Sequence, residues 1–258
     1  MLPREEAGAH MLTLIPAFQD NYIYLLRTGR GLWIVDPGDA QPVLEYLEQR
    51  HLRPTAILCT HHHADHVGGV AQLVARYQIP VYGHGQEIPH LTHPVAEESQ
   101  EIDGLTVEVL EIPGHTLDHI AYLWQDILFC GDTLFAAGCG RIFEGNPAMM
   151  YASLQKLAAL PDDTQVCCAH EYTQNNLRFA AAVEPENPAI CERMEQVARL
   201  RQREQASLPT TVREEKRSNP FLRCRVDSVI GAACAHGAED DSEIAVFTAL
   251  RQWKDGFR

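Results

Sequence analysis

The most informative segment of the chain is Thr60-His61-His62-His63-Ala64-Asp65-His66. It places four imidazoles and one carboxylate within six residues, directly after the apolar run 56–59. Imidazoles and carboxylates at the exit of a strand need partners, because burial removes the water that would otherwise solvate them. A metal ion is the natural partner, so the segment predicts a metal site.

Spacing within the segment predicts which side chains share a face. In an extended chain alternate residues point to the same side, so His61 and His63 face together while His62 faces away. Asp65 and His66 follow in a turn that leads to a helical pattern at 70–77, and they can fold back toward the same point. Two clusters of ligands are more than one four-coordinate ion with an open position accepts, which indicates two metals. A metal-free histidine-rich turn is the alternative.

Three other strand-like runs each lead to a further potential ligand. Runs 106–112, 127–130 and 165–169 lead to His115, Asp132 and His170. In layered α/β architectures functional groups gather where strands end, since loops there vary without disturbing the packed sheet. Taken singly, Asp132 could cap a turn and His170 could be a core histidine. Taken together, the four strand exits favour a common metal centre.

Four motifs together resemble the metallo-β-lactamase fold: residues 60–66, Pro113-Gly114-His115-Thr116, Gly131-Asp132-Thr133-Leu134-Phe135 and Cys168-Ala169-His170-Glu171-Tyr172. Further stretches make the chain similar to the glyoxalase II, or hydroxyacylglutathione hydrolase, family: Ile15-Pro16-Ala17-Phe18, Asp20-Asn21-Tyr22, Val35-Asp36-Pro37-Gly38, Gly138-Cys139-Gly140-Arg141 and Asn219-Pro220-Phe221. The resemblance runs from about Met11 to the C-terminus. It implies an α/β fold, a metallo-β-lactamase-like αββα sandwich with a smaller helical C-terminal domain.

The resemblance also implies a role for each potential ligand. One metal ion would be bound by His61, His63 and His115, and the other by Asp65, His66 and His170. Asp132 would bridge both ions. Asp132, with a metal-bound hydroxide, and Asp65 are the implied catalytic residues. Zinc is the implied metal, with iron and manganese as alternatives, because all three suit mixed histidine and carboxylate ligands.

The implied reaction is hydrolysis of S-(2-hydroxyacyl)glutathione thioesters, typically S-D-lactoylglutathione, to glutathione and a 2-hydroxy acid such as D-lactate. This is the second step of methylglyoxal detoxification. A hydroxide bridging the metals would attack the thioester carbonyl, and one metal would stabilise the oxyanion that forms. The alternatives are an iron-dependent persulfide dioxygenase, another hydrolase of the same fold, and a non-catalytic metal-binding module.

Five positions match residues with which the family binds its substrate: Arg141, Phe143, Tyr172, Arg251 and Lys254. Phe143 stands where some family members have a tyrosine, and the change removes one hydrogen bond to glutathione. Arg251 and Lys254 are three residues apart on a predicted terminal helix, so a solvated helix face is their alternative.

Three more residues lie next to the implied ligands in the sequence. Asp36 and His119 are candidates to support the ligands from behind. Their alternatives are an aspartate that caps a turn and a hydrogen-bonded core histidine. Asp118 stands where the family commonly has glycine.

Length and composition agree with two parts of unequal size. A chain of 258 residues that is 45% hydrophobic can bury one large core or two unequal ones. Strand and helix signals alternate to about residue 172, and the pattern then becomes helical, with helices expected in 175–205 and 241–254 and a polar connection at 208–219. The predicted parts are a disordered N-terminal extension at 1–10, a catalytic domain at 11–172 and a helical substrate-binding domain at 173–258.

Net charge and cysteine usage narrow the range of expected binding partners. A net charge of −14 repels polyanions, which disfavours a nuclease of the same fold. The irregular spacing of the eight cysteines does not suggest a disulfide framework, and no apolar run approaches the roughly 20 residues that span a bilayer. We expect a cytoplasmic monomer whose partner is a glutathione thioester, with no nucleic-acid or membrane partner.

Overall fold

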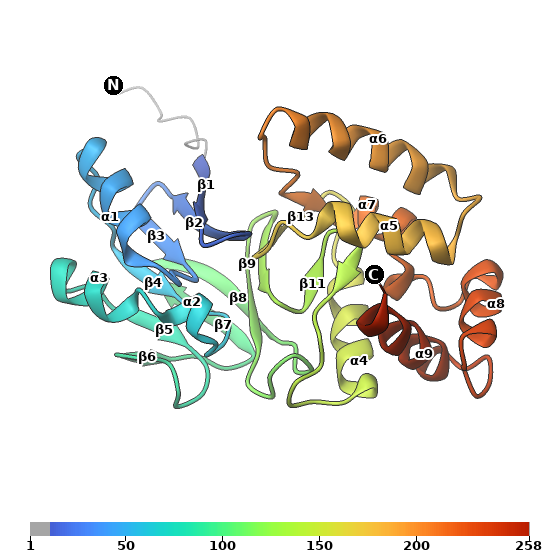
Figure 1. The fold of residues 1–258 in the computed structure, drawn as a ribbon. Helices are drawn as coiled ribbons and strands as arrows, with labels where there is room; N and C mark the ends of the chain where they lie inside the picture. The colour runs from blue at the N-terminus through green and yellow to red at the C-terminus, as the bar shows by residue number, and fades with distance from the viewer. Residues whose placement is uncertain (1–10, 258) are drawn as a thin grey trace, which may run out of the picture. The chain divides into compact units, whose positions relative to one another are not determined.

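The computed structural model describes residues 11–257 (Figure 1). The expectation of disorder at 1–10 lies outside the described residues. The described residues divide into two compact units, one formed by 11–110 and Tyr122–Gln125, the other by Glu111–Ala121 and 126–257.

The first unit contains a six-stranded sheet whose strands are ordered as they occur in the sequence, from β1 to β6. Pairing is antiparallel from β1 to β3 and parallel from β3 to β6. Strands β3 and β4 are buried along their whole length, as parallel strands covered on both faces usually are. The strands are β1 (Met11–Ala17), β2 (Asn21–Arg27), β3 (Leu32–Val35), β4 (Ala56–Leu58), β5 (Val81–Gly83) and β6 (His93–Pro94).

Helices α1 (Ala40–Gln49) and α3 (Val70–Tyr77) pack on one face of this sheet (Figure 1). Each helix buries a stripe at helical spacing, Val43 and Leu47 on α1 and Val70 and Leu73 on α3. Their partners come from alternate positions of the strands, which is how one face of a sheet is presented. The unit also contains the short helix α2 (Ala64–Val67) and the antiparallel hairpin β7 (Glu98–Ile102) to β8 (Leu105–Glu111).

The second six-stranded sheet has the order β14-β13-β10-β9-β8-β7. In the second unit, β10 (Ile127–Gly131) and β13 (Gln165–Cys168) pair in parallel, and β14 (Thr210–Thr211) adds antiparallel to β13. Strand β9 is Ile120–Trp124. A separate small hairpin joins β11 (Leu134–Phe135) to β12 (Gly138–Cys139).

Helices make up about half of the described residues of the second unit (Figure 1). Three begin with Pro directly after a capping Asn, an arrangement in which the missing N–H costs nothing. The helices are α4 (Pro147–Ala158), α5 (Thr173–Val183), α6 (Pro188–Gln202), α7 (Val212–Ser218), the 3-10 helix η1 (Pro220–Leu222), α8 (Asp227–Ala235) and α9 (Glu243–Gly256).

The expected helix at 70–77 and the expected C-terminal helices are confirmed by α3, α5, α6 and α9. The expectation of a polar connection at 208–219 is wrong, because β14 and α7 occupy it. Thr211 caps α7 by accepting the N–H of Glu214 at 3.2 Å. The sequence Thr211-Val212-Arg213-Glu214 is the capping pattern that signals such a helix start.

Candidate active site

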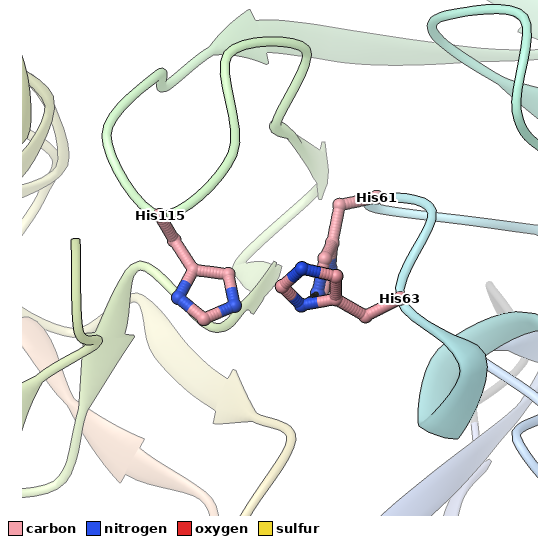
Figure 2. Close-up of side chains that lie close together, drawn as sticks. All are labelled: His61, His63 and His115. Atoms are coloured by element: carbon pink, nitrogen blue, oxygen red, sulfur yellow. Dashed lines mark hydrogen bonds between the residues drawn. The ribbon is translucent and has the colours of Figure 1, made fainter. Parts of the chain in front are cut away.

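His61 and His63 lie in the loop after β4, and Figure 2 shows both side chains leaving this loop. The strand ends at Leu58, so the extended strand expected to reach His63 is shorter than predicted. The two rings still turn to the same side, with His61 Nε2 3.2 Å from His63 Nδ1. His62 instead lies 3.5 Å from the Glu87 carboxylate. The expected division between these histidines is therefore confirmed.

Helix α2 carries Asp65 and His66 at its first turn, and His66 Nε2 lies 3.6 Å from Asp65 Oδ2. The other ring nitrogen of His66, Nδ1, is 3.1 Å from Asp36 Oδ2. A carboxylate is only an acceptor, so Nδ1 carries the proton and Nε2 is left with a lone pair for a metal. Asp36 thus supports a predicted ligand from behind, as expected.

Two neighbours hold these carboxylates in place. Asp36 accepts two further hydrogen bonds, from the N–H and the hydroxyl of Thr60 at 2.8 and 2.7 Å. Asn21, at the start of β2, donates to Asp65 Oδ2 at 3.0 Å. In the sequence, Asn21 stands out only as part of a segment similar to the family, and no role was expected for it.

In the second unit, Asp132 lies between two histidines and turns one oxygen to each. Its Oδ2 is 3.5 Å from His115 Nε2, and its Oδ1 is 3.3 Å from His170 Nε2. His115 comes from the loop after β8 (Figure 2), and its Nδ1 donates to the Arg141 carbonyl at 2.8 Å. Nε2 of His115 is therefore the nitrogen with a lone pair, as a metal ligand requires.

His119 orients the backbone of Asp132. Its Nε2 accepts the Asp132 N–H at 3.1 Å, and its Nδ1 donates to the Ile120 carbonyl at 3.1 Å. The two bonds define a neutral ring that is buried within the site. At Gly140 the chain passes so close that a Cβ would lie 1.8 Å from the Asp132 carbonyl oxygen, which only glycine allows.

Each unit thus carries a cluster of His and Asp side chains whose donor chemistry suits divalent metal ions. His66, His115 and His170 each turn Nε2 toward a carboxylate, so a carboxylate stands beside the histidines in both clusters. Among the described residues, the seven predicted ligands divide into His61, His63, Asp65 and His66 in the first unit and His115, Asp132 and His170 in the second.

A cleft of about 490 Å³ opens beside His115 and Asp132 in the second unit. It is lined by all five residues predicted to contact the substrate, Arg141, Phe143, Tyr172, Arg251 and Lys254. Tyr172 stacks on His170 with ring centroids 4.8 Å apart, and Phe143 packs edge-on against His115 at 5.2 Å. Aromatic rings therefore join the cleft to the histidines.

Arg251 is buried, so the exposed helix face considered for it is excluded. Its Nη1 donates to the Cys139 carbonyl at 2.8 Å, and its Nη2 donates to Asp255 at 2.9 Å. Lys254 is half-buried, and this burial, together with the charge of Arg251, lowers its pKa to about 8. Nothing in the structure explains the aspartate at position 118.

All eight cysteines are free thiols, which confirms that they form no disulfide framework. Cys139 lines the cleft, but burial raises its pKa. Its thiol is therefore poorly suited to form a reactive thiolate.

Two family models cover the chain. The metallo-beta-lactamase superfamily matches residues 18–170, and the hydroxyacylglutathione hydrolase C-terminus matches residues 171–257. A hydroxyacylglutathione hydrolase from Nitrosomonas europaea is 49% identical over 255 residues, which are 96% of this chain and 97% of that protein. The chain belongs to the hydroxyacylglutathione hydrolase family. This membership favours the expected hydrolase over the persulfide dioxygenase considered as an alternative.

Solved structures give the same fold. The B3 metallo-beta-lactamase BLEG-1 superposes with a TM-score of 0.63 at 27% identity, covering 82% of this chain and 99% of that one. TTHA1623, solved in a di-iron-bound form, has a TM-score of 0.60 at 29% identity and covers 82% of this chain and 100% of its own. The predicted α/β class and metallo-β-lactamase fold of this hydroxyacylglutathione hydrolase family member are confirmed.

None of the helices among residues 11–257 combines the length and the apolar character needed to cross a membrane.

Proposed function

We propose that the chain hydrolyses S-(2-hydroxyacyl)glutathione thioesters, typically S-D-lactoylglutathione, to glutathione and a 2-hydroxy acid. Family membership supports the reaction class. The observation that carries the proposal is the Asp132 carboxylate, which turns one oxygen to His115 and the other to His170 beside a cleft with cationic walls. Such a carboxylate suits a two-metal hydrolytic centre.

The proposed metal ligands are two sets of three residues with Asp132 shared between them. One set is His61, His63 and His115, and the other is Asp65, His66 and His170, which is the division that the family resemblance implies. The family resemblance makes zinc our first choice, with iron or manganese as alternatives. Bound divalent ions would supply an activated water and polarise the thioester carbonyl.

Protein side chains then hold the substrate and the ligands in place. Lys254 and Arg141 attract the carboxylates of glutathione, and Tyr172 and Phe143 provide apolar walls to the cleft. Asp36, His119 and the Arg141 carbonyl fix the orientation of the ligand side chains. Proton donation to the leaving group is not needed, because a thiolate leaves readily.

We further propose that residues 11–172 form the catalytic part and residues 173–258 the substrate-binding part, and that the protein works as a cytoplasmic monomer. The free thiols support a reducing compartment. Cell fractionation and light scattering of the purified protein test these two assignments.

The function is tested by loss of thioester absorbance with S-D-lactoylglutathione, alongside elemental analysis of the same preparation. We expect hydrolysis and close to two transition-metal ions per chain. Oxygen uptake with glutathione persulfide, without thioester hydrolysis, would support the dioxygenase instead. A fully active preparation with one ion per chain would refute the two-metal centre.

A further inference from the structure

Glu215 on α7 forms an ion pair with Arg193, and 0% of the Glu215 side chain is exposed. Arg193 of α6 donates to its Oε1 at 2.6 Å, and Thr210 donates to the same oxygen at 2.9 Å. The other oxygen, Oε2, accepts from the backbone N–H of Ala137 at 2.8 Å and from the Asn219 side chain at 2.9 Å. Four donors therefore converge on one buried carboxylate.

Ala137 belongs to the turn between β11 and β12, and its φ of 55° places it in the left-handed region. This conformation is unfavourable for a residue other than glycine. Other buried side chains hold the same turn. Asn219 donates to the carbonyls of Phe135 and Gly138 at 3.2 and 2.9 Å, and Asn176 donates to the Ala136 carbonyl at 3.1 Å.

The hairpin that is held in this way forms one wall of the cleft. Phe135 packs edge-on against His170 at 5.7 Å and against Tyr172 at 5.2 Å. The Cys139 carbonyl at the other end of the hairpin accepts the hydrogen bond from Arg251. The hairpin thus connects Glu215 on α7 with the side chains that surround the cleft.

We propose that Glu215 is a positioning residue, which fixes the β11–β12 hairpin so that Phe135 and the Cys139 carbonyl orient His170, Tyr172 and Arg251. Its effect on catalysis rests on the function proposed above. The negative charge is required by the hydrogen-bond pattern, since both oxygens of Glu215 only accept. An amide has one accepting and one donating end, so Glu215→Gln must break the bonds on one side in either orientation.

Glu184 provides a matched control, because it is also a buried carboxylate in the second unit. It accepts from Arg223 at 2.7 and 3.0 Å and from Ser228 at 2.8 Å. None of these partners belongs to the hairpin. Glu184→Gln therefore disturbs a buried ion pair without touching residues 134–139.

The experiment compares Glu215→Gln and Glu184→Gln by thermal unfolding, hydrogen exchange of peptides covering residues 133–140, and kinetics with S-D-lactoylglutathione. Both variants should unfold at lower temperature. Only Glu215→Gln should speed exchange in the hairpin, by about tenfold or more. The kcat/KM of Glu215→Gln should fall by about tenfold to a hundredfold, because a mutation far from the reacting atoms can still misplace the groups of the active site by a small distance.

The positioning role would be overturned if the hairpin of Glu215→Gln exchanged hydrogen at the wild-type rate, or if the exchange rate in the hairpin rose equally in both variants. If Glu215→Gln does not fold, Asn219→Ala removes two hairpin bonds and keeps the charge, and it must show the same local increase in exchange. If the wild type fails to hydrolyse the thioester, the proposed function fails, while hydrogen exchange still decides the role of Glu215.

Discussion

Arg251 donates a hydrogen bond to the carbonyl of Cys139, 112 residues away in the sequence, at 2.8 Å. The guanidinium is therefore part of the packing that joins α9 to the β11–β12 hairpin. The spacing of Arg251 and Lys254 correctly placed both on one helix, but spacing does not reveal whether a helix face meets solvent. Buried Phe247 and Leu250 on the same helix accompany Arg251 into the interior.

Replacing Arg251 should therefore affect stability as well as substrate affinity. Arg251→Ala leaves the Cys139 carbonyl and Asp255 without their donor, and removing a charged partner from a buried site costs about 2–4 kcal/mol. Urea unfolding with and without the variant measures this loss. Lys254→Ala is the control, because Lys254 is half-buried and its hydrogen bond to the Asn175 carbonyl is longer, at 3.3 Å. Equal stability of the two variants would contradict the structural role of Arg251.

Asp132→Asn tests the shared carboxylate. The change keeps the size of the side chain but replaces one accepting oxygen by an amide group that cannot bind a metal. Metal content should fall, and turnover should fall by more than about a hundredfold, since even residues behind the ligands are worth ten- to a hundredfold. Elemental analysis and the thioester assay measure both. Asp126→Asn is the control: Asp126 directly precedes β10, and its replacement should leave metal content and turnover unchanged. If Asp132→Asn kept two ions and near-normal turnover, Asp132 would be only a turn residue.

Asp36→Asn tests the support behind His66. Asp36 accepts from His66 and twice from Thr60, and an asparagine cannot accept all three bonds with its single oxygen. Metal affinity measured by competition with a chelator should fall by about tenfold to a hundredfold. Asp39→Asn is the matched control, because Asp39 lies three residues away and caps α1, a position where asparagine serves equally well. An unchanged affinity in Asp36→Asn would show that this hydrogen bond does not orient the ligand.

The sequence indicates the candidate ligands more directly than the side chains that support them. His61, His63 and Asp132 follow strands, and strand exits can be recognised from short apolar runs. The bond from the Asp132 N–H to His119 depends instead on how two loops pack. No local pattern in the sequence encodes that packing, so the role of His119 could be named only as one of two alternatives.

The burial of Glu215 also could not be predicted from its sequence neighbours. It stands in the charged run Arg213-Glu214-Glu215-Lys216-Arg217, which is typical of a solvent-exposed segment. The structure buries Glu215 alone of the five side chains in this run, because α6 and the β11–β12 hairpin supply its donors. Those donors come from positions 193 and 137, so composition near 215 cannot predict the burial.

The pKa of Lys254 predicts how substrate affinity depends on pH. Burial, together with the nearby charges of Arg251 and Arg178, lowers this pKa to about 8. Below pH 8 the lysine is protonated and attracts the carboxylates of glutathione. Above pH 8 the free enzyme loses this charge, so the KM should rise while kcat stays the same, because the contact is far from the thioester.

Wild type and Lys254→Arg should therefore diverge between pH 7 and pH 9. The wild-type kcat/KM, which reports groups of the free enzyme, should fall by about twofold to fivefold, the value of one partly solvated ion pair. Arginine keeps its charge throughout this range, so Lys254→Arg should lack this step in its profile. Lys254→Met should lack it too, at a higher KM. A Lys254→Arg profile that follows the wild type would assign the pH dependence to another group and remove Lys254 from substrate binding.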